Sequence, residues 1–174
     1  ISEITLWLSM QEVGVVIQQG GFDLISSYMT LFKISVCVEP VVEAALTNLA
    51  QSLAKLFMKV NPKLISSHII HNSLSILLPL LSQGKHELLN FEAIIALTNL
   101  SSFDIESDTI VKQGGWILGF KCLGETNPEI VAYAVQFMAN LSISEEISKE
   151  IEEGKCEKEV KILISLMKER VEDK

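Results

Sequence analysis

Few residues in this chain have the type and spacing that metal binding or catalysis requires. His68 and His71 are three positions apart, so on a helix they would share one face. A zinc site would need two further ligands, and no cysteine is close to them in the sequence. The sequence also lacks a nucleophile elbow, a phosphate-binding glycine loop, a dinucleotide-binding glycine motif and the helix motif of zinc proteases. We therefore predict no metal, no cofactor and no enzymatic activity.

A repeated asparagine indicates a different chemistry, the binding of polypeptide backbone. Three segments align on Asn48, Asn99 and Asn140, which are 51 and 41 residues apart. A leucine follows each asparagine, and the positions three and six residues before it are mostly small and apolar. The asparagine amide can hydrogen-bond the backbone of a neighbouring loop, which is a structural role, or the backbone of an extended ligand. The sequence leaves both roles open, and they do not exclude each other.

Helices must position these asparagines, because the sequence shows no hairpin turns and no sustained alternation of apolar and polar residues. Asn61-Pro62 and Asn127-Pro128 each place a capping residue before a proline suited to a first helical turn. Pro79 lies within an apolar run and is expected to kink its helix or to delay the start of that helix. We expect the asparagine-bearing helices near residues 40–56, 90–102 and 128–142.

Corners between helices precede the asparagines at similar distances. We predict corners at Gly20-Gly21, Asn72 and Gly114-Gly115, because glycine and asparagine tolerate left-handed backbone. The last residue of each corner comes 27, 27 and 25 residues before the matching asparagine. A fourth corner at Gly154 is followed by an apolar-periodic segment, but no fourth asparagine helix follows. Each unit is thus predicted to contain a short helix, a corner, a second helix and a long third helix.

The repeat period of about 40 to 45 residues is typical of armadillo and HEAT proteins, and the glycine corner favours armadillo. We predict an all-α fold, a right-handed armadillo-like helical repeat solenoid, because such units cannot bury their apolar faces alone. The expected repeats are approximately 15–60, 61–102, 103–144 and a partial unit at 145–174. The partial unit has no third helix to cover its apolar side chains, which must pack on the 133–141 helix or stay exposed. They are Val160, Ile162, Leu163, Leu166 and Met167.

Charge and composition exclude several classes of function. The net charge is −8, with 14 basic and 22 acidic residues, and Arg170 is the only arginine. This balance argues against nucleic-acid binding, which favours basic surfaces rich in arginine. The longest apolar run, Ile76–Leu81, is far shorter than the roughly 20 residues of a membrane span, so we predict no membrane partner. Three widely spaced cysteines indicate a reducing, cytoplasmic location. The absence of an initial methionine leads us to expect a fragment.

One stripe on each third helix is the expected client-binding groove, because residues four apart share a helix face. Amides in the stripe would hold the backbone of an extended segment, and its aromatic and apolar groups would pack against side chains. The core is expected on the opposite side of each helix. The stripe comprises Ala44, Asn48 and Ser52 on the first helix, Glu92, Ile95, Asn99 and Phe103 on the second, and Tyr133, Gln136, Asn140 and Ser144 on the third.

Residues 50–102 resemble the UCS family of myosin chaperones. The resemblance is strongest in NFEAIIALTNL at residues 90–100, and AQSLAK at 50–55 and the SLxxxxPLL pattern at 73–81 support it. It continues more weakly through IVKQGG at 110–115 and the later EEISKEIEEG segment, whereas the first 40 residues carry little of it. The resemblance implies an armadillo-type domain that binds the myosin motor head and assists its folding or protects it from aggregation. It also implies that a heat-shock chaperone is a partner, through a tetratricopeptide domain that this chain does not contain.

Other functions remain open beside the myosin chaperone. Importin-alpha-type receptors carry Trp four residues before each groove asparagine, whereas this chain has Ala44, Ile95 and Gln136 there. A catenin-like groove is usually strongly basic, unlike this acidic chain. The main alternative is a general armadillo scaffold or adaptor for another extended partner. An enzyme with an unrecognised site is a third hypothesis, which would require turnover by the isolated domain.

Overall fold

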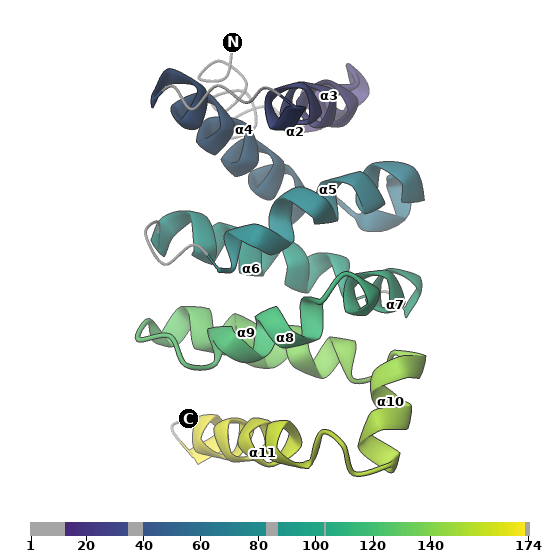
Figure 1. Ribbon diagram of the computed structural model, residues 1–174, viewed down its shortest axis with the longest axis vertical. Coiled ribbons are helices and arrows are strands. Elements are labelled where there is room, and N and C mark those ends of the chain that lie inside the picture. Colours follow the sequence, from purple (N-terminus) through teal and green to yellow (C-terminus); the bar gives the residue numbers. More distant parts are fainter. Residues whose placement is uncertain (1–12, 35–39, 83–86, 103, 173–174) are drawn as a thin grey trace.

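The computed structural model describes residues 13–34, 40–82, 87–102 and 104–172, and within these ranges every regular element is a helix (Figure 1). The three predicted third helices are confirmed as α4, α6 and α9. The elements are α2 (Val13–Gln18), α3 (Gly21–Ile34), α4 (Pro40–Lys59), the 3-10 helix η1 (Pro62–Leu64), α5 (Ser67–Leu80), α6 (Glu87–Leu100), α7 (Asp104–Lys112), α8 (Gly115–Cys122), α9 (Pro128–Leu141), α10 (Glu145–Glu152) and α11 (Glu157–Glu172).

The helices stack along one axis, as predicted for a right-handed armadillo-like solenoid (Figure 1). The long third helices pack in succession, α4 on α6 and α6 on α9. The second helices α3, α5 and α8 each pack on the third helix of their own group. Because consecutive third helices lie side by side, residues about 40 positions apart in the sequence share one continuous surface. None of the helices in the described ranges is both long and apolar enough to cross a lipid bilayer.

Two kinds of glycine make the predicted corners. Gly20, Gly114 and Gly154 have φ angles of 74°, 86° and 76°, a left-handed conformation that favours glycine. Glycine is required at position 115 for a different reason, because a Cβ atom there would lie 2.8 Å from the main-chain oxygen of Ile110. The second helix can therefore start against the end of the first only where a side chain is absent.

The corner predicted at Asn72 is wrong. Asn72 lies inside α5, and no residue other than glycine has a positive φ in the described ranges. The short turn η1, capped by the side chain of Asn61, takes the place of a first helix in this group, and α5 begins soon after it. Pro79 lies in the last turn of α5 and does not delay the start of that helix. Because only Leu80 follows it in α5, the missing N–H of Pro79 interrupts the helical hydrogen bonds only at the end of the helix.

The core lies between the second and third helices. The leucine after each asparagine is buried, and so are the small residues on the same side of α6 and α9. At the end of the stack α11 packs against α9, with Leu163 buried and Val160 and Leu166 half-buried. Met167 and Ile164 remain about half exposed, at 49% and 47%. Some apolar side chains of this last group are therefore buried or half-buried where α11 packs on α9, and others stay exposed, so both arrangements expected from the sequence occur.

Candidate protein-binding face

The repeated asparagines tie consecutive third helices together. The side-chain nitrogen of Asn99 donates to the main-chain oxygens of Phe57 at 2.6 Å and Val60 at 2.9 Å. These carbonyls lie at the end of α4, where helical partners run out. The Asn140 nitrogen likewise donates to the main-chain oxygen of Thr98 at 3.2 Å and to the Ser101 hydroxyl at 3.1 Å. Asn99 and Asn140 therefore both brace the fold, and the side-chain nitrogen of each donates two hydrogen bonds.

The predicted stripe becomes a surface that we call the third-helix face, formed by α4, α6 and α9. The structure brings most predicted residues together there, although several of them also pack internally. Tyr133 is 37% exposed, Ala44 and Gln136 are exposed, and Ile95 and the three asparagines are half-buried. Phe103 lies outside the described residues. The members of the third-helix face are Ala44, Asn48, Ile95, Asn99, Tyr133, Gln136 and Asn140, together with Phe91 and Glu129, which the sequence analysis did not select.

Three stripe residues are buried instead of facing a groove. Glu92 is 4% exposed, and its carboxylate pairs with the ammonium of Lys55 on α4. The expectation of a surface Glu92 is thus corrected, because α4 covers this side of α6. Ser52 is fully buried and donates to the main-chain oxygen of Asn48 at 2.7 Å. Ser144 is 3% exposed because its hydroxyl caps the start of α10.

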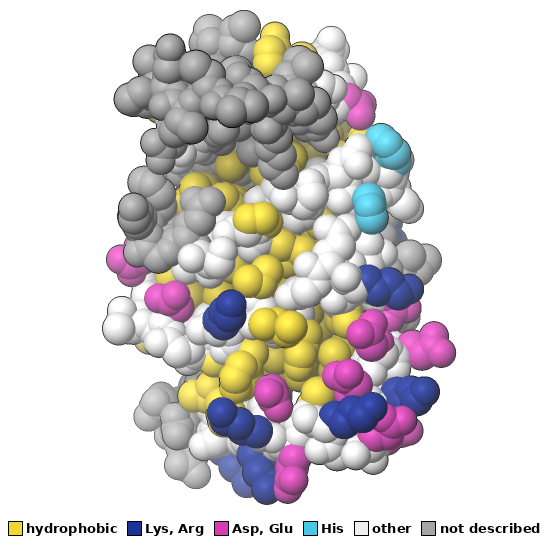
Figure 2. Space-filling view, viewed as in Figure 1, with side chains coloured by type: hydrophobic (Ala, Val, Ile, Leu, Met, Phe, Trp, Pro, Cys, Tyr) yellow, Lys and Arg dark blue, Asp and Glu magenta, His cyan; other side chains and the backbone are white. Residues whose placement is uncertain are grey.

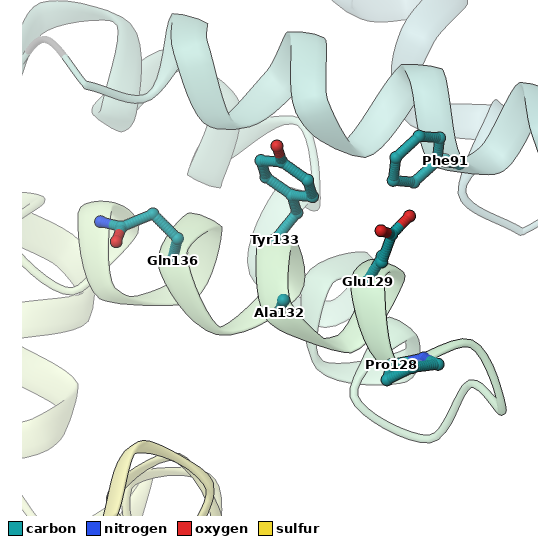
Figure 3. A pocket seen from close by; sticks show the side chains of 6 residues that line it. All are labelled: Phe91, Pro128, Glu129, Ala132, Tyr133 and Gln136. Atoms are coloured by element: carbon teal, nitrogen blue, oxygen red, sulfur yellow. The ribbon is translucent and has the colours of Figure 1, made fainter. Parts of the chain in front are cut away.

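A cleft of about 490 Å³ opens on the third-helix face between α6 and α9. Figure 3 shows Tyr133 and Glu129 rising from α9 toward α6, where the Phe91 ring lies opposite them. The Phe91 and Tyr133 rings are in edge contact, with centroids 5.9 Å apart and planes at 68°. The remaining lining residues belong to α9 and continue the cleft along that helix. They are Pro128, Ala132 and Gln136.

Hydrogen bonds hold the two ends of this cleft. At one end the Asn127 amide donates to the Glu87 carboxylate at 2.8 Å, and its oxygen accepts from the main-chain nitrogen of Glu129 at 2.9 Å. At the other end the Gln136 amide donates to the side-chain oxygen of Asn140 at 2.9 Å. The cleft is therefore bordered by fixed polar groups on both sides of its aromatic pair.

Glu129 was missed because the stripe on α9 ended at Tyr133, two turns before Asn140. Phe91 was missed because the stripe on α6 took the neighbouring Glu92 as the position two turns before Asn99. Phe91 lies four residues before Ile95, and Glu129 lies four residues before Tyr133, so both continue faces already chosen. One further turn toward the start of α9 would have found Glu129, and counting four residues back from Ile95 would have found Phe91 in place of the buried Glu92.

A second hollow of about 310 Å³ lies on the opposite side of the stack, between α5 and α8. Figure 2 shows hydrophobic side chains gathered in a band over this face. Ile117 on α8 is 64% exposed here, and Leu78, Pro79 and Leu118 line the hollow. Among the described residues that line this hollow, no aromatic pair corresponds to Phe91 and Tyr133.

The histidines and cysteines form no reactive cluster in the described ranges. His68 and His71 are exposed, with the Asn72 and Gln113 amides as their neighbours at 3.4 Å and 3.3 Å. No group of three or more His, Cys, Asp or Glu side chains suited to a metal ion occurs among the described residues. Burial raises the pKa of the Cys122 thiol to about 11, so this sulfur stays protonated and unreactive near neutral pH.

Solved structures similar to this chain include a designed armadillo repeat protein and two engineered proteins. A designed armadillo repeat protein in complex with the peptide (KR)4 has a TM-score of 0.60 and 17% identity, over 87% of this chain and 61% of the other. An engineered protein gives a TM-score of 0.58 at 20% identity, over 87% of this chain and 59% of the other. A second gives 0.56 at 22%, over 81% of this chain and 32% of the other.

These likenesses support the fold alone, at identities this low. This chain spans about 60% of the length of the first two proteins and about a third of the last. No protein-family model matches the sequence, and no curated protein matches it. The armadillo-like fold predicted from the repeats is thus confirmed.

Proposed function

We propose that this chain is a protein-binding module whose third-helix face holds an extended segment of a partner protein. The observation that carries the proposal is the cleft between α6 and α9, where Tyr133 remains 37% exposed beside Phe91. Partly exposed aromatic side chains in a hollow are typical anchors of protein interfaces. A structural neighbour of the same fold holds a peptide, which supports a polypeptide as the kind of ligand.

Two amide oxygens on this face are suited to holding a partner's backbone. The Asn99 nitrogen is committed to α4, but the Asn99 oxygen makes no hydrogen bond with the described residues. The Gln136 nitrogen is committed to Asn140, and the Gln136 oxygen is likewise without a partner in the described ranges. Each residue can therefore brace the fold through its nitrogen and accept a backbone N–H through its oxygen. Ile95 and Tyr133 would then pack against side chains of the segment.

Selection from a displayed library of random extended peptides tests this function. Peptides recovered on the wild-type protein are expected to bind Tyr133→Ala and Ile95→Ala more weakly by about 1–3 kcal/mol. Ile117→Ala is the matched control, since it removes an exposed isoleucine from the opposite face. Thermal unfolding of each variant shows whether it is folded. Unchanged affinity in folded Tyr133→Ala and Ile95→Ala proteins would exclude the third-helix face as the binding surface.

We further propose the myosin motor domain as the partner, with assisted folding or protection from aggregation as the outcome. This finer proposal rests on the resemblance of residues 50–102 to the UCS family. The test is light scattering by a purified myosin motor during heating, with and without this chain. Suppressed scattering that is lost in Tyr133→Ala supports the proposal. Absence of binding and protection would exclude myosin and leave the general module, the adaptor for another extended partner.

A further inference from the structure

We propose that the cleft between α6 and α9 takes the cationic side chain of a lysine or arginine from the partner segment. This inference rests on the proposed function and specifies the chemistry that the segment must carry. It follows from three features of the cleft, namely its aromatic pair, its charge and its amide acceptor.

The aromatic pair provides surfaces that attract cations. The Phe91 and Tyr133 rings meet at 68° with centroids 5.9 Å apart, so the faces of the two rings are turned in different directions. An ammonium or guanidinium group within about 6 Å of a ring centroid is attracted by the negative face of the ring. The long aliphatic stem of lysine or arginine can pack on the same rings, while the charged head remains near water.

The charge of the cleft is negative. Glu129 is the charged residue among those lining the cleft, and no lysine or arginine of the described ranges pairs with it. Glu87 adds a second carboxylate at the same end, where the Asn127 side chain joins it to the start of α9. The first turn of α9 carries partial positive charge that offsets part of this field. Two carboxylates against one helix terminus still leave the site negative, in a chain whose net charge is −8.

The amide acceptor lies beyond Tyr133. Because the Gln136 nitrogen donates to the Asn140 oxygen at 2.9 Å, the Gln136 side chain is held in a defined orientation with its oxygen still able to accept. A cationic head carries several donors and no acceptor, which matches a carboxylate on one side and an amide oxygen on the other. An acidic side chain would meet Glu129 with like charge, and a purely apolar one would leave that carboxylate without a partner.

Fluorescence anisotropy with a labelled, alternating lysine–arginine octapeptide tests this inference. The neutral control peptide replaces lysine by norleucine and arginine by citrulline, which keeps length and shape. We expect the neutral peptide to bind at least about tenfold more weakly. Glu129→Gln is expected to weaken binding of the cationic peptide about threefold to tenfold, and Tyr133→Leu by a similar factor. Circular dichroism and thermal unfolding confirm that each variant is folded.

The control variant separates a local site from general attraction by an acidic protein. Glu152→Gln on α10 removes the same charge from an exposed position away from the cleft and is expected to change affinity less than about twofold. Equal losses in Glu129→Gln and Glu152→Gln, or equal binding of both peptides, would overturn the inference. So would a wild-type protein that fails to bind the cationic peptide. In any of these cases, the proposed function stands if Tyr133→Ala and Ile95→Ala still weaken the binding of the library-selected peptides. If they do not, both the cationic-site inference and the proposed function are wrong.

Discussion

The side-chain nitrogen of Asn99 lies 2.6 Å from the main-chain oxygen of Phe57, and this bond joins α6 to the end of α4. Asn140 repeats the arrangement one helix later with the main-chain oxygen of Thr98, and both pairs are separated by 42 residues. The repeated asparagine therefore joins successive third helices by side-chain hydrogen bonds. A carbonyl at a helix end that loses such a donor becomes an unsatisfied polar group.

Asn99→Ala should lower the free energy of unfolding by about 1–3 kcal/mol, because it leaves the carbonyls of Phe57 and Val60, at the end of α4, without their side-chain donor. The loss in Asn140→Ala should be smaller, since its bonds are longer, at 3.2 Å and 3.1 Å. Urea unfolding measures both. Asn72→Ala is the control and should change stability by less than about 0.5 kcal/mol, since alanine suits a helix. Equal losses of unfolding free energy in all three variants would contradict this structural role of Asn99 and Asn140.

The parts of this fold that repeat could be predicted, and the parts that break the repeat could not. The asparagine helices, the caps at Asn61 and Asn127 and the glycine corners each follow from a local rule that one residue type satisfies. Asn72 was misplaced because asparagine tolerates left-handed backbone without requiring it, and the surrounding apolar residues favour an uninterrupted helix. The local sequence pattern does not show whether tertiary contacts favour a corner or a continuous helix at Asn72.

The candidate site was only partly predictable for a similar reason. Alignment on the asparagines makes Glu92 equivalent to Tyr133, yet Glu92 is 4% exposed and Tyr133 is 37% exposed. Burial at this position depends on Lys55, whose pairing with Glu92 crosses 37 residues and has no counterpart in the periodic pattern. The aromatic partner of Tyr133 was missed because counting seven residues back from Asn99 selects the buried Glu92 and not its neighbour Phe91, which forms the other wall of the cleft.

The two classes of corner glycine should respond differently to alanine. Gly154→Ala should cost about 1 kcal/mol, because its φ of 76° strains an L-residue although the Cβ atom meets open space. Gly115→Ala should cost more, about 2–3 kcal/mol, since its Cβ would lie 2.8 Å from the Ile110 oxygen and 2.3 Å from an Ile110 methyl carbon. Thermal unfolding ranks the two. A Gly115→Ala protein as stable as the wild type would show that α7 and α8 can separate freely.

The buried pair of Lys55 and Glu92 predicts an asymmetric response to mutation. Lys55→Met should destabilise the fold by about 3 kcal/mol, because it leaves a carboxylate whose side chain is only 6% exposed. The second oxygen of this carboxylate already has no hydrogen-bond partner among the described residues. Combining Lys55→Met with Glu92→Leu should recover most of this loss, because no buried charge then remains.

The exposed pair of Lys161 and Glu157 provides the matched control for that experiment. Their side chains are 71% and 68% exposed, so Lys161→Met should change the unfolding free energy by less than about 0.5 kcal/mol. Urea unfolding of the four proteins gives the comparison. A double variant no more stable than Lys55→Met would show that the pair contributes packing or specificity beyond charge compensation.

The Cys122 thiol gives the fold a dependence on alkaline pH. Cys122 is fully buried with its sulfur 3.9 Å from the Leu81 main-chain oxygen, and burial, aided by the Glu125 carboxylate, raises its pKa from 9.0 to about 11. The folded state therefore holds this proton more tightly than the unfolded state. Its contribution to stability is complete below about pH 9 and is lost as the pH rises through about 11.

Urea midpoints measured across that range should fall more steeply for the wild type than for Cys122→Ala, which has no thiol at this position to ionise. Alanine leaves a small cavity, so Cys122→Ala should be less stable than the wild type at neutral pH and should approach it as the pH rises. Other groups that titrate at alkaline pH, including Cys156, are common to both proteins and cancel in the difference. Parallel pH profiles for the two proteins would show that the buried thiol of Cys122 is not linked to folding.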